Sequence, residues 1–202
     1  MHTKLKIIGC GGHLRVVIDA LSLCEHAYEI SLCDSNKELL NTVVCSFLVD
    51  SDIDSLSEFI GYVHVTIGNN KIRERIFNLF HHKAIPLSII HPKAVISKAA
   101  NIGLGTFVAA QAILAPDSAV GQGCIINHCA VVDHEVKIGD FTHVAPNSTL
   151  GGRVSIGSGV LVGAGSVVLP GINIGDNVII AAGAVVINDI ESNTTVKGVP
   201  AV

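Results

Sequence analysis

Polar side chains capable of acid–base chemistry gather between residues 127 and 143. The groups are Asn127-His128, Asp133-His134-Glu135 and Asp140-Phe141-Thr142-His143. An imidazole titrates near neutral pH and can take a proton from a nucleophile, and an adjacent carboxylate can hold the ring in one tautomer. His134 followed by Glu135 supplies both groups. Taken alone, His134 is equally compatible with an ordinary surface histidine. The structural elements that position it are therefore needed to distinguish a catalytic base from a surface residue.

A six-residue repeat runs through the region that contains this cluster. Positions spaced by six residues are Ile, Val or Leu without exception over about a hundred residues. They are Ile90, Ile96, Ile102, Val108, Leu114, Val120, Ile126, Val132, Ile138, Val144, Leu150, Ile156, Val162, Val168, Ile174, Ile180 and Val186. Strands of an ordinary β-sandwich vary in length and do not keep such a phase. The repeat therefore predicts short strands joined by tight corners.

Glycines recur at every third hexad, so three hexads form one turn of a three-sided coil. These glycines are Gly103, Gly121, Gly139, Gly157 and Gly175. We expect glycine at one corner either because a side chain would crowd the bend or because φ is positive there. Residues 90–191 give about five and a half coils, stacked as parallel strands with the aliphatic side chains inside. His134 comes two residues after an inward-facing position and is expected to point outward near a corner.

Residues 1–86 lack the repeat and predict a separate, small Rossmann-like α/β domain ahead of the β-helix domain at 87–202. A strand at Leu5–Ile8 leads into the loop Gly9-Cys10-Gly11-Gly12-His13 and an amphipathic helix through Leu23. Backbone N–H groups at such a helix start favour phosphate. The spacing departs from G-x-G-x-x-G because Leu14 takes the last position, so the loop is also compatible with a tight turn.

The same domain contains two further strands and a second helix. A strand at Tyr28–Cys33 ends at Asp34, whose carboxylate could meet a ribose hydroxyl or a base edge, or be a plain loop residue. A strand at Val63–Ile67 precedes Gly68-Asn69-Asn70, where asparagine is explained by helix capping. The following helix, Lys71–Phe80, is expected to place on one face Ile72, Ile76, Leu79 and Phe80.

Composition narrows the function classes. The 202 residues carry a net charge of −4 and 4% aromatic side chains with no Trp, so the core is aliphatic and a dedicated nucleic-acid binder is disfavoured. The longest apolar run, Val178–Ile187, is too short to span a membrane, and the N-terminus does not read as a signal peptide. Six Cys without a C-x-x-C pair indicate reduced thiols in a cytoplasmic protein rather than disulfides or zinc.

The hexad half resembles the left-handed parallel β-helix acyltransferases, and Gly198-Val199-Pro200-Ala201 is similar to the G-V-P-A ending common in them. With the Gly-x-Gly-Gly-His loop and the Ile-Gly-Asn-Asn stretch, nearly the whole chain resembles the sugar acetyltransferases of the bacillosamine and sialic-acid type. The resemblance implies that residues 1–86 bind a sugar nucleotide and that residues 87–202 form a left-handed β-helix that binds acetyl-CoA.

The resemblance also implies roles for individual residues. The run from Asp133 to His143 matches the family motif in full, with His134 as general base and Glu135 as its orienting carboxylate. His143 would contact acetyl-CoA or order the site. His128 reads as structural or supporting. The backbone N–H of Gly152 would serve the oxyanion, and backbone contacts to the pantetheine arm would come from Ala164 and Ala182.

The acceptor side is implied in the same way. Gly11, Gly12 and His13 would approach the phosphates or the sugar, and Cys33 and Asp34 would lie near the nucleotide. Bacillosamine members tend to be acidic at both of the last two positions. Cys33 departs from that pattern, so the sequence does not determine which base the nucleotide carries.

The resemblance leads us to expect an acetyl-CoA-dependent N-acetyltransferase that acts on the 4-amino group of a nucleotide-linked, UDP-type amino-dideoxy sugar, by direct transfer and without a metal. An O-acetyltransferase of a sialic-acid-like sugar, a non-catalytic or metal-binding β-helix and a nucleotide-sugar sensor remain alternatives. His134 and His143 are half a coil apart and should point to different sides of the prism. If both line one site, the second comes from a neighbouring subunit, as in the homotrimers typical of the family.

Overall fold

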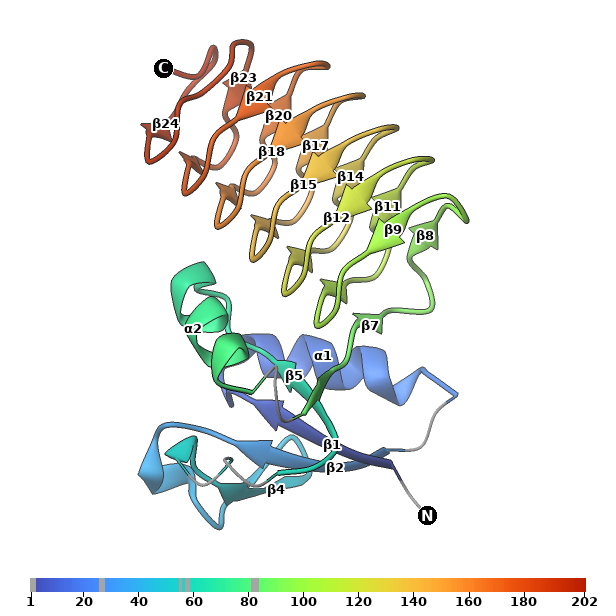
Figure 1. Cartoon of the computed structure of the whole chain (residues 1–202), viewed down its shortest axis with the longest axis vertical. Helices are drawn as coiled ribbons and strands as arrows, with labels where there is room; N and C mark the ends of the chain where they lie inside the picture. The colour runs from blue at the N-terminus through green and yellow to red at the C-terminus, as the bar shows by residue number, and fades with distance from the viewer. Residues whose placement is uncertain (1–2, 26–27, 55, 57–58, 81–83) are drawn as a thin grey trace.

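The computed structural model describes the chain except residues 1–2, 26–27, 55, 57–58 and 81–83. An α/β domain is followed by a three-sided parallel β-helix, and both helices of the first domain lie between its sheet and the β-helix (Figure 1). The fold class predicted from the sequence is confirmed. None of the helices among the described residues is long and apolar enough to cross a membrane.

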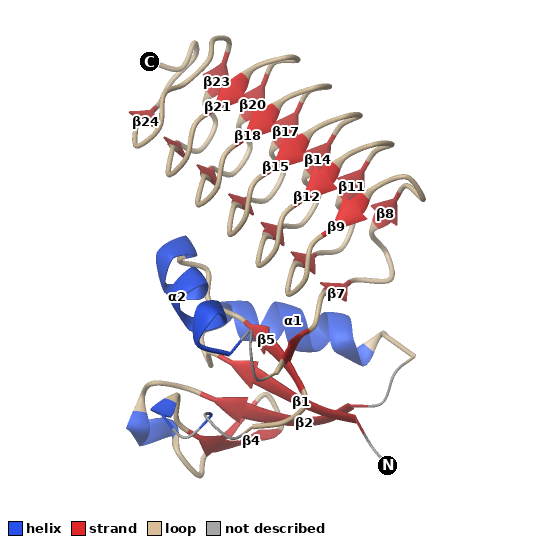
Figure 2. Cartoon of the chain, viewed as in Figure 1, coloured by secondary structure: helices blue, strands red, loops and turns tan. Residues whose placement is uncertain are grey.

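The first domain combines one sheet with two α-helices, as Figure 2 shows. Its elements are β1 (Thr3–Ile8), α1 (Gly12–Ser22), β2 (Tyr28–Cys33), a 3-10 turn (Lys37–Leu39), β3 (Val43–Val44), β4 (Phe47–Ser51), β5 (Tyr62–Val65), α2 (Asn70–Phe80) and β6 (Ile85–Pro86). The sheet order is β3-β4-β2-β1-β5-β6, and among the described strands only β3 and β4 pair antiparallel. The strands β3, β4 and β6 were not predicted from the sequence.

The first strand and helix confirm the predicted strand, glycine loop and helix. Gly9 has a φ of +109°, and a β-carbon there would lie 2.8 Å from Ile67 Cγ1, so the turn after β1 needs glycine. The core of the domain buries Leu5 and Ile7 of β1 against Leu14 and Val17 of α1.

The buried face of α2 differs from the predicted one. Arg73, Ile76, Phe77 and Phe80 are buried, whereas 43% of Ile72 and 55% of Leu79 are exposed. The two candidate faces share Ile76 and Phe80 and differ by a small rotation of the helix. The rotation follows from Arg73, whose guanidinium donates to carbonyl groups beneath the helix. Hydrophobic periodicity in the sequence does not reveal these acceptors.

The β-helix is built from two-residue strands on three sheets. The junction sheet, which faces the first domain, contains β7 (Ile89–Ile90), β10 (Phe107–Val108), β13 (Ile125–Ile126), β16 (His143–Val144), β19 (Leu161–Val162), β22 (Ile179–Ile180) and β24 (Thr195–Val196). The apolar sheet contains β8 (Val95–Ile96), β11 (Ile113–Leu114), β14 (Val131–Val132), β17 (Thr149–Leu150), β20 (Val167–Val168) and β23 (Val185–Val186). The polar sheet contains β9 (Asn101–Ile102), β12 (Ala119–Val120), β15 (Lys137–Ile138), β18 (Ser155–Ile156) and β21 (Asn173–Ile174).

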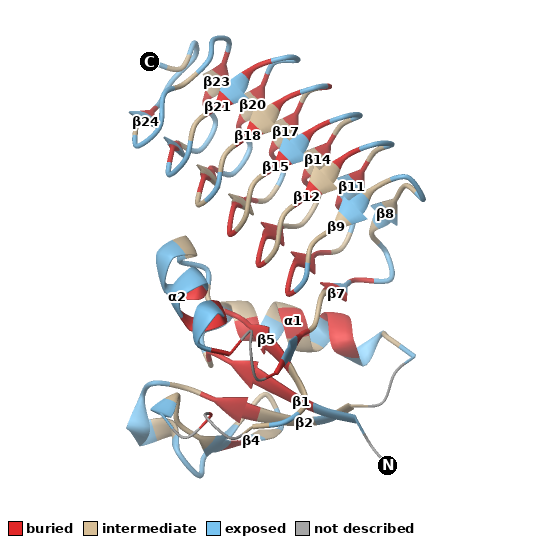
Figure 3. Cartoon of the chain, viewed as in Figure 1, coloured by how far each residue is buried: buried red, intermediate tan, exposed pale blue. Residues whose placement is uncertain are grey.

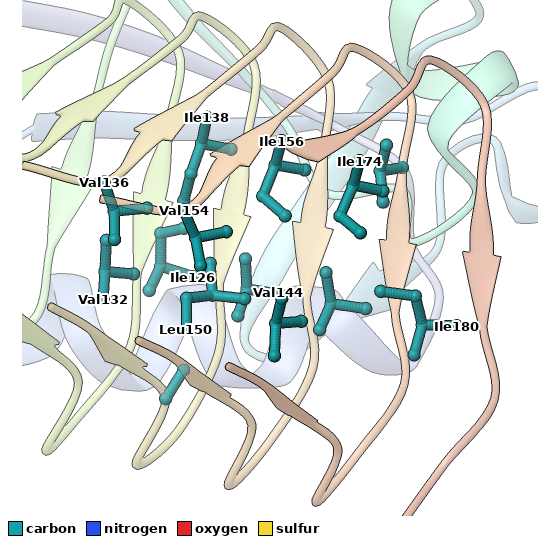
Figure 4. Close-up of a cluster of buried hydrophobic side chains, with 14 of the residues drawn as sticks. Ile126, Val132, Val136, Ile138, Val144, Leu150, Val154, Ile156, Ile174 and Ile180 are labelled. Atoms are coloured by element: carbon teal, nitrogen blue, oxygen red, sulfur yellow. The ribbon is translucent and has the colours of Figure 1, made fainter. Parts of the chain in front are cut away.

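The second residue of each strand points inward and forms the predicted aliphatic ladders (Figure 4). Each strand pairs in parallel with the corresponding strand of the next coil, for example Val132 with Leu150. The prediction fails at the first position, since 38% of Ile90 is exposed. Ile90 lies in the first coil, where no earlier coil covers the open end of the stack; the burial of the later coils is seen in Figure 3.

The glycines that recur once per coil are required by crowding and not by a positive φ. A β-carbon at Gly103 would lie 2.5 Å from the backbone N of Gln122, and one at Gly139 would lie 2.6 Å from the backbone of Gly157. Consecutive coils therefore approach each other too closely at this corner for any side chain, which explains why glycine returns at every third hexad.

The two domains share a hydrophobic core. Ile89, Phe107 and Ile125, the outward side chains of the first three strands of the junction sheet, are buried in the same cluster as Leu14 and Val17 of α1. Strand β6 is the last strand of the first sheet and β7 the first of the junction sheet. This shared core fixes the position of the glycine loop at the start of α1 relative to the junction sheet.

Candidate active site

His134 lies at the corner between the apolar and polar sheets, where β14 turns towards β15. Its side chain points outward with 47% of its surface exposed, as predicted. The ring Nδ1 lies 3.0 Å from Glu135 Oε2, and the backbone N–H donates to Asp133 Oδ1 (2.7 Å). Because Nδ1–H faces a carboxylate, Nε2 carries the free lone pair and is the basic atom of the ring.

The main chain around His134 is fixed by the coils on either side. Glu135 N–H donates to Pro116 O (3.0 Å), and Arg153 N–H donates to His134 O (2.9 Å). Glu135 has a φ of +59°, and Asp117 and Arg153 at the same corner of the neighbouring coils have +61° and +62°, so the positive φ belongs to the turn. The histidine and its carboxylate are therefore held by three successive coils of the β-helix.

Gly152 lies on the next coil, directly beside the His134 ring. A β-carbon at Gly152 would lie 2.6 Å from His134 Cε1 and would also strike Nε2. The N–H groups of Gly151 and Arg153 donate to backbone carbonyls, whereas the N–H of Gly152 has no hydrogen-bond partner among the residues that the structure describes. A base and a free N–H donor thus lie next to each other, which suits a reaction that develops negative charge on a carbonyl oxygen.

His143 lies on a different sheet, at the outward position of β16 on the junction sheet. Its Nε2 is 3.2 Å from Asn127 Nδ2. Burial and the nearby Arg73 lower the pKa of His143 to about 4, and a hydrogen bond with the backbone of Gly68 opposes this shift. His143 is therefore neutral at physiological pH. The predicted separation of His134 and His143 onto different sides of the prism is confirmed.

The glycine loop of the first domain reaches the junction sheet near His143. His13 in the first turn of α1 packs edge-on against Phe107, with ring centroids 5.2 Å apart. Burial, together with His64 and His143, lowers the pKa of His13 to about 3. A neutral His13 would contact a phosphate or sugar as a hydrogen-bonding group and not as a cation. Around Gly11 and Gly12, β-carbons would meet nothing within 4 Å, so the loop backbone is open to a ligand.

Cys33 and Asp34, at the end of β2, differ in what they can offer a nucleotide. Cys33 is completely buried, and burial raises the pKa of its thiol to about 12. Its side chain faces the core, so we do not propose a direct contact with a ligand. Asp34 accepts from the N–H of Cys10 (2.6 Å) and of Asn36 (2.8 Å). Asp34 therefore holds the glycine loop in shape.

Ala164 and Ala182 are exposed and stacked on consecutive coils at the corner between the junction and apolar sheets. The N–H of Gly183 donates to Ala164 O (2.9 Å). His128 lies two coils earlier at the same corner. The candidate residues thus fall into two groups on opposite edges of the apolar sheet. One edge holds His134 and Gly152, and the other holds the alanines.

Arg73 belongs to the junction, and sequence reasoning missed it. A charged residue in an amphipathic helix normally marks the solvent face, yet Arg73 is 1% exposed. The predicted asparagine cap is Asn69, which accepts from Ile72 N–H (3.0 Å). Asn70 Nδ2 instead donates to the backbone oxygens of Gly159 (3.0 Å) and Val160 (2.9 Å). Among the described residues, no group of three or more His, Cys, Asp or Glu is placed to hold a metal ion.

The buried histidines predict a fold that loses stability in acid. The pKa of His13 is lowered to about 3 and those of His64 and His143 to about 4, from an ordinary value of 6.5. Below pH 6.5 the unfolded chain binds more protons than the folded chain, so the free energy of unfolding falls as the pH falls towards about 4. Urea unfolding midpoints across this window measure the slope. His64→Phe should make it shallower, and a flat wild-type profile would show that these rings titrate normally.

Comparisons with known proteins agree with this architecture. Residues 4–80 match the PglD N-terminal domain, and residues 135–170 and 153–188 match the bacterial transferase hexapeptide (six repeats). A comparison with curated proteins finds no match. The hexapeptide coils place the chain in the class of hexapeptide-repeat transferases.

Solved structures resemble the chain over its full length. The acetyltransferase domain of PglB from Neisseria gonorrhoeae FA1090 is 32% identical, with a TM-score of 0.94 over 100% of this chain and 99% of that chain. PerB from Caulobacter crescentus, solved with CoA and GDP-perosamine, is 34% identical, with a TM-score of 0.90 over 98% and 96%. WeeI from Acinetobacter baumannii AYE, 23% identical with a TM-score of 0.88 over 99% of each chain, shares the fold. The chain belongs to the hexapeptide-repeat sugar N-acetyltransferases of the bacillosamine type.

Proposed function

We propose that the protein transfers the acetyl group of acetyl-CoA to the 4-amino group of a nucleotide-linked amino-dideoxy sugar. The solved relatives support both substrates, since the PglB domain is also known in complex with acetyl coenzyme A and PerB in complex with CoA and GDP-perosamine. The observation that carries the proposal within this chain is the His134 imidazole, oriented by Glu135 and packed against the free N–H of Gly152.

The arrangement suits direct transfer. The neutral amine of the sugar attacks the thioester carbonyl carbon, a C–N bond forms, and the carbonyl π electrons move to the oxygen. The N–H of Gly152 donates to this oxyanion. His134 Nε2 takes the proton that the nitrogen must lose, while Glu135 holds Nδ1–H and stabilises the imidazolium. The C–S bond then breaks, and the thiolate of CoA receives the proton, which leaves an amide and free CoA without an acyl-enzyme.

The acceptor would be held by the first domain and by the junction sheet. The open backbone at Gly11 and Gly12, shaped by Asp34, suits the diphosphate because N–H groups at the start of α1 favour anions. His13 and His143 lie beside that loop as neutral hydrogen-bonding groups. The nucleotide is proposed to be UDP-linked, with GDP as the other base to be tested, since one relative was solved with a GDP-sugar.

The test is thioester consumption by the purified protein with acetyl-CoA and UDP- or GDP-linked 4-amino sugars. Each amino sugar is paired with the same nucleotide sugar carrying a 4-hydroxyl group. We expect CoA release and an acetylated product with the amino sugars only. Turnover of the hydroxyl sugars alone would make the protein an O-acetyltransferase, and the absence of turnover with every amino sugar would refute the proposed function.

A homotrimer would unite the two groups of residues that a single chain keeps apart. The apolar sheet lies between the His134 edge and the Ala164 edge, and its outward side chains are almost all aliphatic. They are Val95, Ile113, Val131, Thr149, Val167 and Val185. Val95 is 61% and Ile113 38% exposed in the single chain. Three copies with this sheet turned towards a common axis would bring His134 of one copy beside the alanines and His143 of the next.

Charged substitutions on the apolar sheet are expected to dissociate the trimer and abolish activity together. Ile113→Glu combined with Val131→Glu places carboxylates in the proposed interface, where burial without a partner is costly. Sedimentation should change from three times the 21.0 kDa chain to the single chain. Ala119→Glu, at the outward position of β12 on the polar sheet, is the matched control and should remain trimeric. A fully active monomer would contradict the shared site.

A further inference from the structure

Arg73 is buried between the two domains, and none of its described partners is a carboxylate. It is 1% exposed, and all five of its N–H groups are used. Nε donates to Gly123 O (2.6 Å), Nη1 to Ile67 O (2.9 Å) and Gly68 O (3.1 Å), and Nη2 to Asn70 Oδ1 (2.8 Å) and Phe141 O (2.8 Å). Burial lowers its pKa to about 10, so the guanidinium stays charged at neutral pH. Burying a cation whose partners are all neutral oxygens costs free energy, so a contribution to stability alone does not explain Arg73.

The backbone acceptors of Arg73 come from three places that meet around the proposed acceptor site. Ile67 and Gly68 form the loop after β5, at the carboxyl end of the sheet, where open α/β sheets bind their ligands. Gly123 and Phe141 lie in the turns that lead into β13 and β16 of the junction sheet. Phe141 is two residues before His143. One planar group therefore connects the loop of the first domain to the strand that carries His143.

The connection closes into a ring through His143 itself. The imidazole forms a hydrogen bond with the backbone of Gly68, whose carbonyl oxygen also accepts from Arg73. Its Nε2 faces Asn127 Nδ2 at 3.2 Å. Arg73 from α2 and His13 from α1 are the charged and titratable described groups that face this ring. The His143 imidazole therefore lies between Asn127 on one side and the Gly68 backbone with Arg73 on the other.

Asn70 provides a second tie of the same kind. Its side-chain oxygen accepts from Arg73, and its nitrogen donates to Gly159 O and Val160 O in the turn that leads into β19, one coil beyond Phe141. The start of α2 is therefore joined to three successive turns of the β-helix by side-chain hydrogen bonds. Only neutral carbonyls and an amide are used, so these ties add no carboxylate that would repel a phosphate.

We propose that Arg73 is a positioning residue for the acceptor substrate: by holding the loop Ile67–Gly68 and the backbone before His143 at one spacing, it fixes the orientation of His143 towards the nucleotide sugar. This inference rests on the proposed function. Of the two roles that the resemblance implies for His143, contact with acetyl-CoA or ordering of the site, the inference takes the second. It places the effect of Arg73 on the acceptor, while the other proposed contacts of acetyl-CoA lie at Gly152, Ala164 and Ala182. A residue that served only the fold would affect both substrates alike.

The experiment compares Arg73→Met and Arg73→Lys with Arg75→Met, an exposed arginine on the same helix. We expect Arg73→Met to raise KM for the nucleotide sugar by at least about tenfold, with KM for acetyl-CoA within about twofold, because small misplacements of a site are costly. Arg73→Lys should restore the charge and much of the lost Tm but not KM, since an ammonium lacks the planar fork. Arg75→Met should match the wild type.

NMR titration of the His143 ring gives a readout that does not depend on activity. Removing the cation and freeing Gly68 should move the His143 midpoint upward in Arg73→Met and leave it low in Arg73→Lys. Asn70→Ala keeps four of the five Arg73 hydrogen bonds and should give a smaller increase in KM for the nucleotide sugar. This variant tests the inference if Arg73→Met does not fold. Equal changes in both KM values, or an unmoved His143 signal, would overturn the inference. Wild-type inactivity on every amino sugar would instead refute the proposed function, and the NMR result would still stand.

Discussion

His134→Ala is expected to lower kcat by about 10²–10⁴-fold, the range that a positioned general base supplies. The imidazole lies on the surface with its Nε2 free, so its removal leaves the aliphatic core intact and Tm should hardly change. KM for the nucleotide sugar should also stay close to the wild-type value, because the acceptor would be held by the first domain. Steady-state kinetics with both substrates, together with thermal unfolding, measure this separation.

Two further variants sharpen the interpretation of His134→Ala. Glu135→Gln keeps a hydrogen-bond partner for Nδ1 but removes its negative charge, and it should lose part of kcat. Lys137→Ala changes an exposed residue just beyond this corner and should match the wild type. If His134→Ala turns over at a near-wild-type rate, another group is the base and the proposed mechanism is wrong.

Gly152→Ala is expected to reduce kcat by about 10²-fold although it adds a single methyl group, since a displacement of about 1 Å can have that cost. The new β-carbon would strike His134 Nε2 and lie 2.6 Å from Cε1, so the ring must swing away from its place beside the Gly152 N–H. Neither residue is lost from the chain, so the effect would come from geometry. Kinetics and a crystal structure of the variant would show it directly.

Gly103→Ala is the matched control for this prediction. Its β-carbon would lie 2.5 Å from the backbone N of Gln122, so it meets main chain and not a movable side chain, at the corner after the polar sheet and not at the corner that carries His134. We expect a lower Tm with kcat retained, the reverse of the pattern for Gly152→Ala. A loss of kcat that follows the loss of Tm in both variants would mean that Gly152 is needed only for the fold.

The β-helix could be predicted in detail because its geometry is local and repeated. Each coil has the same three strands, so one phase fixes every inward position from Val108 to Val186. The phase does not fix the hand of the coil, which the family resemblance supplies. It also fails at Ile90, because burial there depends on a neighbouring coil that does not exist. The reason for one such glycine in every coil became clear only from the distance between coils.

The junction between the domains could not be predicted, because its contacts join residues far apart in the sequence. Arg73 reads as a surface charge until Gly123 and Phe141 are brought beneath it by folding of both domains. The wrong face chosen for α2 has the same origin. His134 and Glu135 could be predicted as an interacting pair because they are adjacent in the sequence. His143, Ala164 and Ala182 lie away from the His134 edge, and the proposed trimer is the arrangement that would bring them close.

The most direct test is a crystal structure of the protein with CoA and a nucleotide-linked 4-amino sugar. The mechanism predicts the sugar nitrogen within hydrogen-bond reach of His134 Nε2, with the nucleotide on the glycine loop of a neighbouring copy and the CoA sulfur beside the Gly152 N–H. A complex in which His134 faces solvent in every copy, while the amine approaches a different base, would contradict it.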